Sequence, residues 1–168
     1  AAPIAKKLFK LLIDRKARLD ASKANGDQAL MLAAQRGNSL VCELLVNRGA
    51  DINAERKDGN RALILAAQSG RQDVCELLLN RGARADVTKE DGDRLFVLSA
   101  QNGHKGVCKL LLEKGANVDA RRSDGTRALT AAAQNGHKDV CKLLLNMGAK
   151  VEASECILAV DNYHEGIC

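Results

Sequence analysis

The chain of 168 residues has very few aromatic side chains and almost no proline. It contains no tryptophan, one tyrosine, two phenylalanines and one proline, although 46% of its residues are hydrophobic. Its core must therefore be built from leucine, alanine and valine, which suits thin helices that pack closely. The shortage of aromatics also argues against binding of single-stranded nucleic acid, because proteins that do so stack bases on aromatic rings.

The usual sequence signals of membrane, catalytic and metal-binding proteins are missing as well. No run of 18 or more apolar residues occurs, so the sequence predicts no membrane span. It contains no C-x-x-C pair and no glycine-rich loop that could hold a phosphate. No cysteine and histidine share the spacing of a nucleophile with its base. We therefore predict that this chain is not an enzyme and uses no cofactor or metal.

The most informative feature that is present is an internal repeat. Four similar segments begin at Gly26, Gly59, Gly92 and Gly125, which are 33 residues apart, and the second reads GNRALILAAQSGRQDVCELLLNRGA. Self-similarity at this period predicts stacked units that bury their apolar faces against one another. The expected units cover approximately 1–22 (partial, second helix only), 23–55, 56–88, 89–121, 122–154 and 155–168 (partial).

Each unit is expected to contain a tight turn followed by two helices. In the second unit Asp58-Gly59 predicts the turn, and the helices should run from Ala62 to Ser69 and from Asp73 to Asn80. Gly70 and Gly82 are expected to end these helices, because glycine accepts the left-handed conformation. The same turn signal recurs in the other units at Asn25-Gly26, Asp91-Gly92 and Asp124-Gly125.

Four of the six cysteines follow the repeat. They occupy the same place in successive second helices, at Cys42, Cys75, Cys108 and Cys141. Stacked helices lie about 8–10 Å apart, whereas a disulfide needs Cα atoms within about 7 Å. We therefore expect four buried, unpaired thiols. Such thiols indicate a reducing compartment, the cytoplasm or alternatively the nucleus.

The histidines follow the repeat in the same way. They occur at or near the start of the second helices, at His104, His137 and His164. A ladder spaced by a whole repeat cannot bring two imidazoles onto one metal ion, so a structural role is expected for each.

The repeat resembles that of the ankyrin-repeat family over nearly the whole chain. The resemblance implies an all-α repeat solenoid, that is, an ankyrin-repeat stack of helix-turn-helix units with short β-finger turns. It also implies a concave surface of fingers and first helices that binds other proteins. The sequence departs from the family's T-P-L-H-x-A pattern, and each lost threonine cap costs about 1 kcal/mol. The threonine position holds Gln28, Arg61, Arg94 and Arg127.

The three arginines at that position form a ladder that can be interpreted in two ways. Each arginine could pair with an aspartate of a neighbouring finger. Alternatively, the guanidinium groups could line the groove as forks for carboxylate or phosphate. The candidate partners in the first interpretation are Asp58, Asp91 and Asp124.

The third unit departs most from the other three. It carries Glu90 and Asp93 at its expected fingertip, and Phe96 and Ser99 replace leucine and alanine in its first helix. Either the core adjusts locally around Phe96 and Ser99, or the unit is shaped for a ligand.

We predict a non-catalytic protein–protein interaction module that binds a partner protein or peptide on its concave finger and first-helix face. As an alternative, the chain is a targeting or substrate-recruiting arm of a larger protein or enzyme, with flanking domains or further repeats as partners. Nucleic-acid binding ranks third, because a net charge of +5 is weak support for it. The expected partner-binding residues are Lys57, Asn60, Arg61, Ser69, Glu90, Asp93, Arg94, Asn102, Ser123, Thr126, Arg127 and Asn135.

Overall fold

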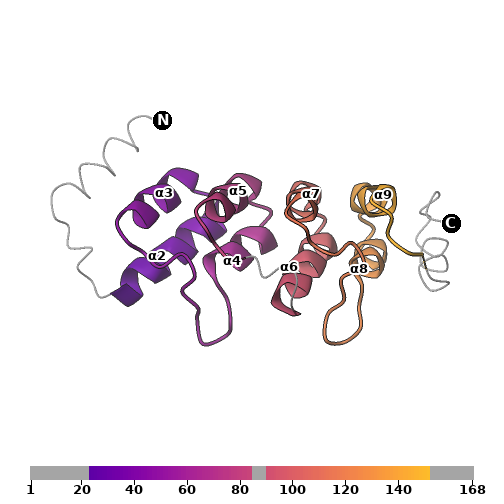
Figure 1. The fold of residues 1–168 in the computed structure, drawn as a ribbon, viewed down its shortest axis with the longest axis horizontal. Helices are drawn as coiled ribbons and strands as arrows, with labels where there is room; N and C mark the ends of the chain where they lie inside the picture. Colours follow the sequence, from indigo (N-terminus) through magenta and orange to yellow (C-terminus); the bar gives the residue numbers. More distant parts are fainter. Residues whose placement is uncertain (1–22, 85–89, 152–168) are drawn as a thin grey trace.

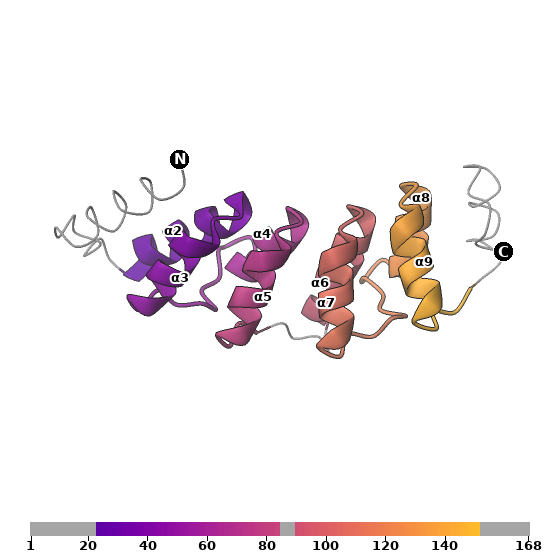
Figure 2. The same ribbon diagram turned by 90° about the horizontal axis from the view of Figure 1, so that it is seen from above.

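A computed structural model describes residues 23–84 and 90–151, which form eight α-helices in four antiparallel pairs. The pairs follow one another along the long axis of the molecule (Figure 1, Figure 2). This arrangement confirms the predicted all-α solenoid. The pairs are α2 (Lys23–Arg36) with α3 (Ser39–Asn47), α4 (Ala62–Gln68) with α5 (Gln72–Asn80), α6 (Glu90–Gln101) with α7 (Lys105–Glu113), and α8 (Ala128–Gln134) with α9 (Lys138–Asn146).

The helices lie in two layers. The first helices, α2, α4, α6 and α8, form one layer, and the second helices, α3, α5, α7 and α9, form the other (Figure 1). In α4 every residue from Ala62 to Ala67 is buried, because the helix has neighbours on both sides and the second-helix layer above it. Alanine at three of these six positions allows the helices to approach closely.

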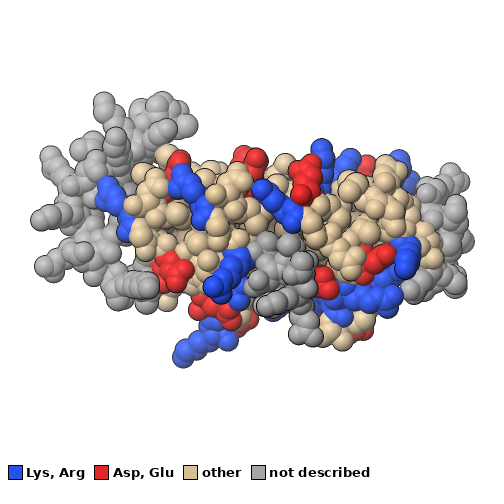
Figure 3. Space-filling view, in the orientation of Figure 1, with Lys and Arg blue, Asp and Glu red and all other residues tan. Residues whose placement is uncertain are grey.

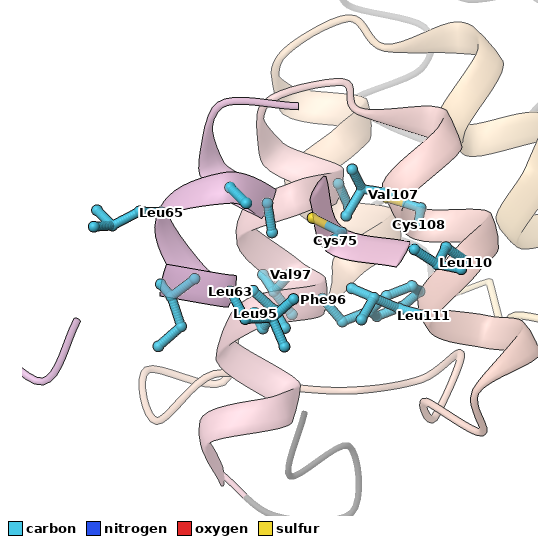
Figure 4. Packing of buried hydrophobic residues seen from close by; sticks show 14 of the residues in the cluster. Leu63, Leu65, Cys75, Leu95, Phe96, Val97, Val107, Cys108, Leu110 and Leu111 are labelled. Carbon is cyan, nitrogen blue, oxygen red and sulfur yellow. The ribbon is translucent and has the colours of Figure 1, made fainter. Parts of the chain in front are cut away.

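One continuous apolar cluster runs through the stack. Each second helix contributes a buried leucine to it, and Figure 4 shows how the side chains of α4 to α7 meet between the layers. The leucines are Leu45, Leu78, Leu111 and Leu144. Since each of them packs within and between units, the stack is held together by shared apolar contacts.

The second and fourth fingers are tight turns, as predicted. In the second finger the Arg56 amide donates to the Asn60 carbonyl at 2.9 Å, and Gly59 has a φ of 75°. In the fourth finger the Arg122 amide donates to the Thr126 carbonyl at 3.0 Å. These two hairpins project beyond the first-helix layer (Figure 1).

The turn predictions for the first and third units were wrong. Asn25-Gly26 lies inside α2, and Asp91-Gly92 lies inside α6. The family's proline, which would set the start of the first helix, is missing from all four units, and the first helix begins earlier in the first and third units than in the second and fourth. Glu90 and Asp93 are therefore part of a helix and not of a fingertip.

Several expectations lie outside the described residues. These are the partial units at both ends of the chain, together with Cys156, His164 and Cys168. Among the helices that the structure does describe, none has the length and apolar character that crossing a membrane requires.

Candidate binding surface

The candidate surface consists of the fingers and the exposed side of the first helices. Where the second finger meets α2, the surface forms a hollow with a volume of about 380 Å³. Charged residues of both signs are interspersed along this edge of the molecule (Figure 3). The hollow is lined by Asp27, Gln28, Met31, Ala54, Glu55, Arg56 and Lys57.

Two members of the arginine ladder are engaged within the protein. Arg61 donates from Nε and Nη2 to Glu55 Oε2 at 2.9 and 2.7 Å, and its side chain is 17% exposed. Arg127 is 4% exposed, and its Nη1 lies 3.8 Å from Asp119 Oδ1. Pairing with a carboxylate is thus the role of these two side chains. Asp119 also accepts a hydrogen bond from the Lys150 amide at 2.9 Å, so the Arg127 contact joins two successive units.

The partners of these two arginines differ from those that we predicted. Asp58 Oδ1 accepts from the Asn60 amide at 3.0 Å, and Asp124 Oδ1 accepts from the Thr126 amide at 2.9 Å. These backbone hydrogen bonds lower the pKa of Asp58 and of Asp124. Each aspartate stabilises its own turn, a well-known use of aspartate before glycine. Arg61 instead pairs with Glu55, and Arg127 pairs with Asp119, both at the bases of the fingers.

Arg94 differs from its two equivalents because it is exposed. Its Nη1 lies 4.0 Å from the position that a Cβ on Gly59 would occupy, so its guanidinium group reaches the finger of the preceding unit. Lys57, on the same finger, is also exposed. The structure therefore brings two predicted site residues together at one fingertip, where both present positive charge to solvent.

The other predicted site residues lie on the fingers or just after the first helices, at the opposite end of each helix. Lys57, Asn102, Ser123 and Asn135 are exposed, whereas Asn60, Ser69 and Thr126 are half-buried. Two of the exposed amides are already bonded to the backbone. Asn102 Nδ2 donates to the Gln68 carbonyl at 3.2 Å, and Asn135 Nδ2 donates to the Ala131 carbonyl at 2.8 Å.

Two of the unusual residues of the third unit belong to the core. Phe96 and Ser99 are both fully buried, at 0% exposure. The Ser99 hydroxyl donates to the Leu95 carbonyl at 2.8 Å, which satisfies it within its own helix. Between the two interpretations of this unit, a local adjustment of the core therefore accounts for Phe96 and Ser99. Asp93 is half-buried on α6.

His104 and His137 have a structural role, as expected, because each connects two neighbouring units. His104 Nε2 lies 2.8 Å from the Gln68 carbonyl oxygen, and His137 Nε2 lies 2.9 Å from that of Gln101. In the second unit Arg71 takes the same place and donates from Nε to the Gln35 carbonyl at 3.2 Å. Sequence reasoning missed this contact, because arginine and histidine share no pattern here.

The four cysteines of the second helices are buried and unpaired, as predicted. Burial raises the pKa of the Cys75 and Cys108 thiols to about 12, and that of the Cys42 and Cys141 thiols to about 11. Thiols in such surroundings are neutral and poor nucleophiles.

We therefore expect these four thiols to be protected in the folded protein. At pH 8 a chromogenic disulfide reagent should modify them at least about a hundredfold more slowly than in the unfolded chain, because the rate follows access and thiolate fraction. The measurement should use Cys156→Ser with Cys168→Ser, which leaves only these four. Fast modification without loss of the helical circular dichroism signal would contradict the burial of the cysteines.

Within the described residues, no three histidine, cysteine, aspartate or glutamate side chains gather as a metal site. A family model described as Ankyrin repeats (3 copies) matches residues 1–91 and 81–155. A comparison with curated proteins gave no match. Ankyrin repeats are generally protein–protein interaction modules, and the family is typically non-catalytic. Since the family model matches most of its length, the chain belongs to the ankyrin-repeat family.

Proposed function

We propose that the chain binds a partner protein or peptide across its fingers and first helices and catalyses no reaction. The observation that carries this proposal is the exposed Arg94 at the second finger. Its equivalents Arg61 and Arg127 neutralise carboxylates of the protein itself, whereas Arg94 and Lys57 present their charges to solvent. A carboxylate of a partner could bind the planar guanidinium group of Arg94 beside the turn of the second finger.

An exposed apolar side chain lies on α2, the helix that borders the hollow. Leu32 of α2 is 46% exposed, although leucines in the rest of the stack are mostly buried. Met31, its neighbour, lines the hollow between α2 and the second finger. A partner that placed an apolar side chain on Leu32 and a carboxylate at Arg94 would combine burial with charge recognition, as binding hot spots do.

The rigidity of the stack favours this kind of binding. Both fingers are closed by backbone hydrogen bonds, and their aspartates hold the tips in one conformation. Little order has to be created when a partner binds, so less of the interaction energy is lost to entropy. The buried thiols favour a reducing compartment, the cytoplasm or the nucleus, as the place where this occurs.

The double substitution Lys57→Glu with Arg94→Glu tests the proposal. Proteins captured from a cell lysate on the immobilised chain should be identified by mass spectrometry, and the affinity of the purified partner should then be measured. We expect at least a tenfold loss of affinity, about 1.4 kcal/mol, because two favourable charges become repulsive.

The matched control is Lys109→Glu with Lys142→Glu, which changes the net charge by the same amount on the opposite layer. This variant should retain the affinity of the wild-type protein for that partner. If the control loses as much affinity as the fingertip variant, binding does not use the finger face and the proposal is wrong.

A further inference from the structure

The outer layer carries a compact group of exposed lysines on its last two helices. Lys105 and Lys109 lie one turn apart on α7, and Lys138 and Lys142 occupy the equivalent positions of α9. All four are exposed, and the Lys109 side chain is 66% accessible. Residues one turn apart are about 6 Å from each other, and neighbouring helices are about 8–10 Å apart. We refer to these four residues as the outer lysine patch. Basic atoms are visible along the upper edge over α7 and α9 (Figure 3).

Stacking of the repeats does not require lysine at these positions. The equivalents of Lys109 and Lys142 in α3 and α5 are glutamates, and those of Lys105 and Lys138 are uncharged. Since the same helix tolerates either sign in the same place, packing leaves the choice open. The side chain at this position changes from negative in α5 to positive in α7, and packing of the core does not explain the change. The uncharged and acidic equivalents are Ser39, Gln72, Glu43 and Glu76.

Cationic residues elsewhere on this layer hold the units together, whereas the patch does not. Arg81 donates to Glu43 Oε1 at 2.8 Å and to Asn47 Oδ1 at 2.7 Å, so it links α5 to α3. Lys109 makes only a contact within its own helix, with its Nζ 3.8 Å from Glu113 Oε1. An exposed pair of this kind contributes little to stability. The positive charge of the patch is thus directed to solvent.

We propose that the outer lysine patch is a second interaction surface, which binds an acidic segment of another protein. Carboxylates spaced along a peptide can meet the four ammonium groups individually and avoid the carboxylates already present nearby. Those are Glu113 on α7 and Asp139 on α9, both exposed. A continuous phosphate backbone would have to pass over these two carboxylates, and the repulsion between like charges disfavours the binding of nucleic acid.

Other occupants fit the patch less well. The only aromatic residue in the described ranges, Phe96, is buried, so no base-stacking platform is available there. A second copy of the chain would bring its own lysines together with its acidic side chains, and its net charge of +5 opposes its approach. An acidic segment of a different protein is the occupant whose charge complements the patch.

Binding of a fluorescently labelled ten-residue polyglutamate peptide, followed by anisotropy at low salt, tests this proposal. The wild-type chain should bind it, and the affinity should fall as salt is added. In Lys109→Glu with Lys142→Glu the affinity should fall at least tenfold. This variant places glutamate where α3 and α5 already carry it, so the fold should be retained, and a thermal melt checks this.

The control is Arg84→Glu with Lys150→Glu, two exposed residues outside both proposed surfaces, which alters net charge equally and should leave peptide affinity within twofold of the wild type. An equal loss in both variants would show general attraction to net charge and overturn the proposal. Tighter binding of duplex DNA or phosphatidylserine vesicles, lost in the Lys109→Glu/Lys142→Glu variant, would assign the patch to a different partner and also overturn it. Neither result bears on the binding proposed for the fingers and first helices, because that binding is measured with a different partner.

Discussion

The substitution Leu78→Ala is expected to lower the free energy of unfolding by about 2–5 kcal/mol. Leu78 is fully buried in α5, in the second-helix layer between α3 and α7. Removing its side chain leaves a cavity that neither neighbouring helix can fill without losing contacts with the unit beyond it. Urea denaturation followed by circular dichroism would measure the loss.

Apolar packing must supply most of the stability of the fold, because the helix ends contribute little. In α4, α5, α7, α8 and α9 the N-cap side chain makes no capping hydrogen bond. Asn38 caps α3, where its Oδ1 accepts from the Val41 amide at 3.3 Å. With caps mostly absent, stability must come from apolar contacts between layers and units.

Leu32→Ala serves as the matched control, since it removes the same atoms from a side chain that is 46% exposed. It should change the stability by no more than about 0.5 kcal/mol. A neutral Leu78→Ala, or equal losses in the two variants, would mean that apolar stacking is not the main source of stability.

Gly70→Ala is expected to destabilise the protein for two separate reasons. Gly70 ends α4 with a φ of 67°, a conformation that costs an L-residue about 1–2 kcal/mol. A Cβ at this position would also lie 2.6 Å from His104 Nδ1, closer than real contacts allow. Moving the ring would disturb its hydrogen bond to the Gln68 carbonyl and add about 1–3 kcal/mol.

Gly82→Ala separates the two causes. Gly82 has a φ of 88°, but a Cβ there would have no neighbour within 4 Å, so only the backbone strain remains. Gly70→Ala should therefore destabilise the protein by at least roughly 1 kcal/mol more than Gly82→Ala. In a double-mutant cycle, His104→Ala should recover much of this difference. Equal losses at the two glycines would show that His104 moves aside without penalty.

Much of the fold could be predicted from the sequence because the repeat contains the same information four times. The apolar spacing in VCELLL and its variants identified the buried face of each second helix, and Cys75 and Leu78 are buried as expected. The glycine after each first helix predicted where it ends, and Gly70 and Gly103 have the positive φ that such ends require. These features are local, since they depend on residues within one helix and its cap.

The predictions that failed rested on a short motif or a single recurring residue, whose surroundings differ from unit to unit. The same Asp-Gly pair forms a turn at Asp58-Gly59 but lies within a helix at Asp91-Gly92, so the pair alone does not determine the conformation. The arginine ladder looks uniform in the sequence, yet Arg61 is bound by Glu55 whereas Arg94 is exposed.

The sequence by itself determined the repeat, the helix pairs, the burial of the cysteine row and the ankyrin-repeat family. The tertiary structure alone decided which charges are neutralised within the stack and which face solvent. The physical reason is that hydrophobic periodicity is written along each helix. Ion pairs such as Arg81 with Glu43 instead join residues of different units, and they depend on how the units are placed against each other. The candidate binding residues could therefore be grouped from the sequence, but only the structure separated Arg94 from its equivalents.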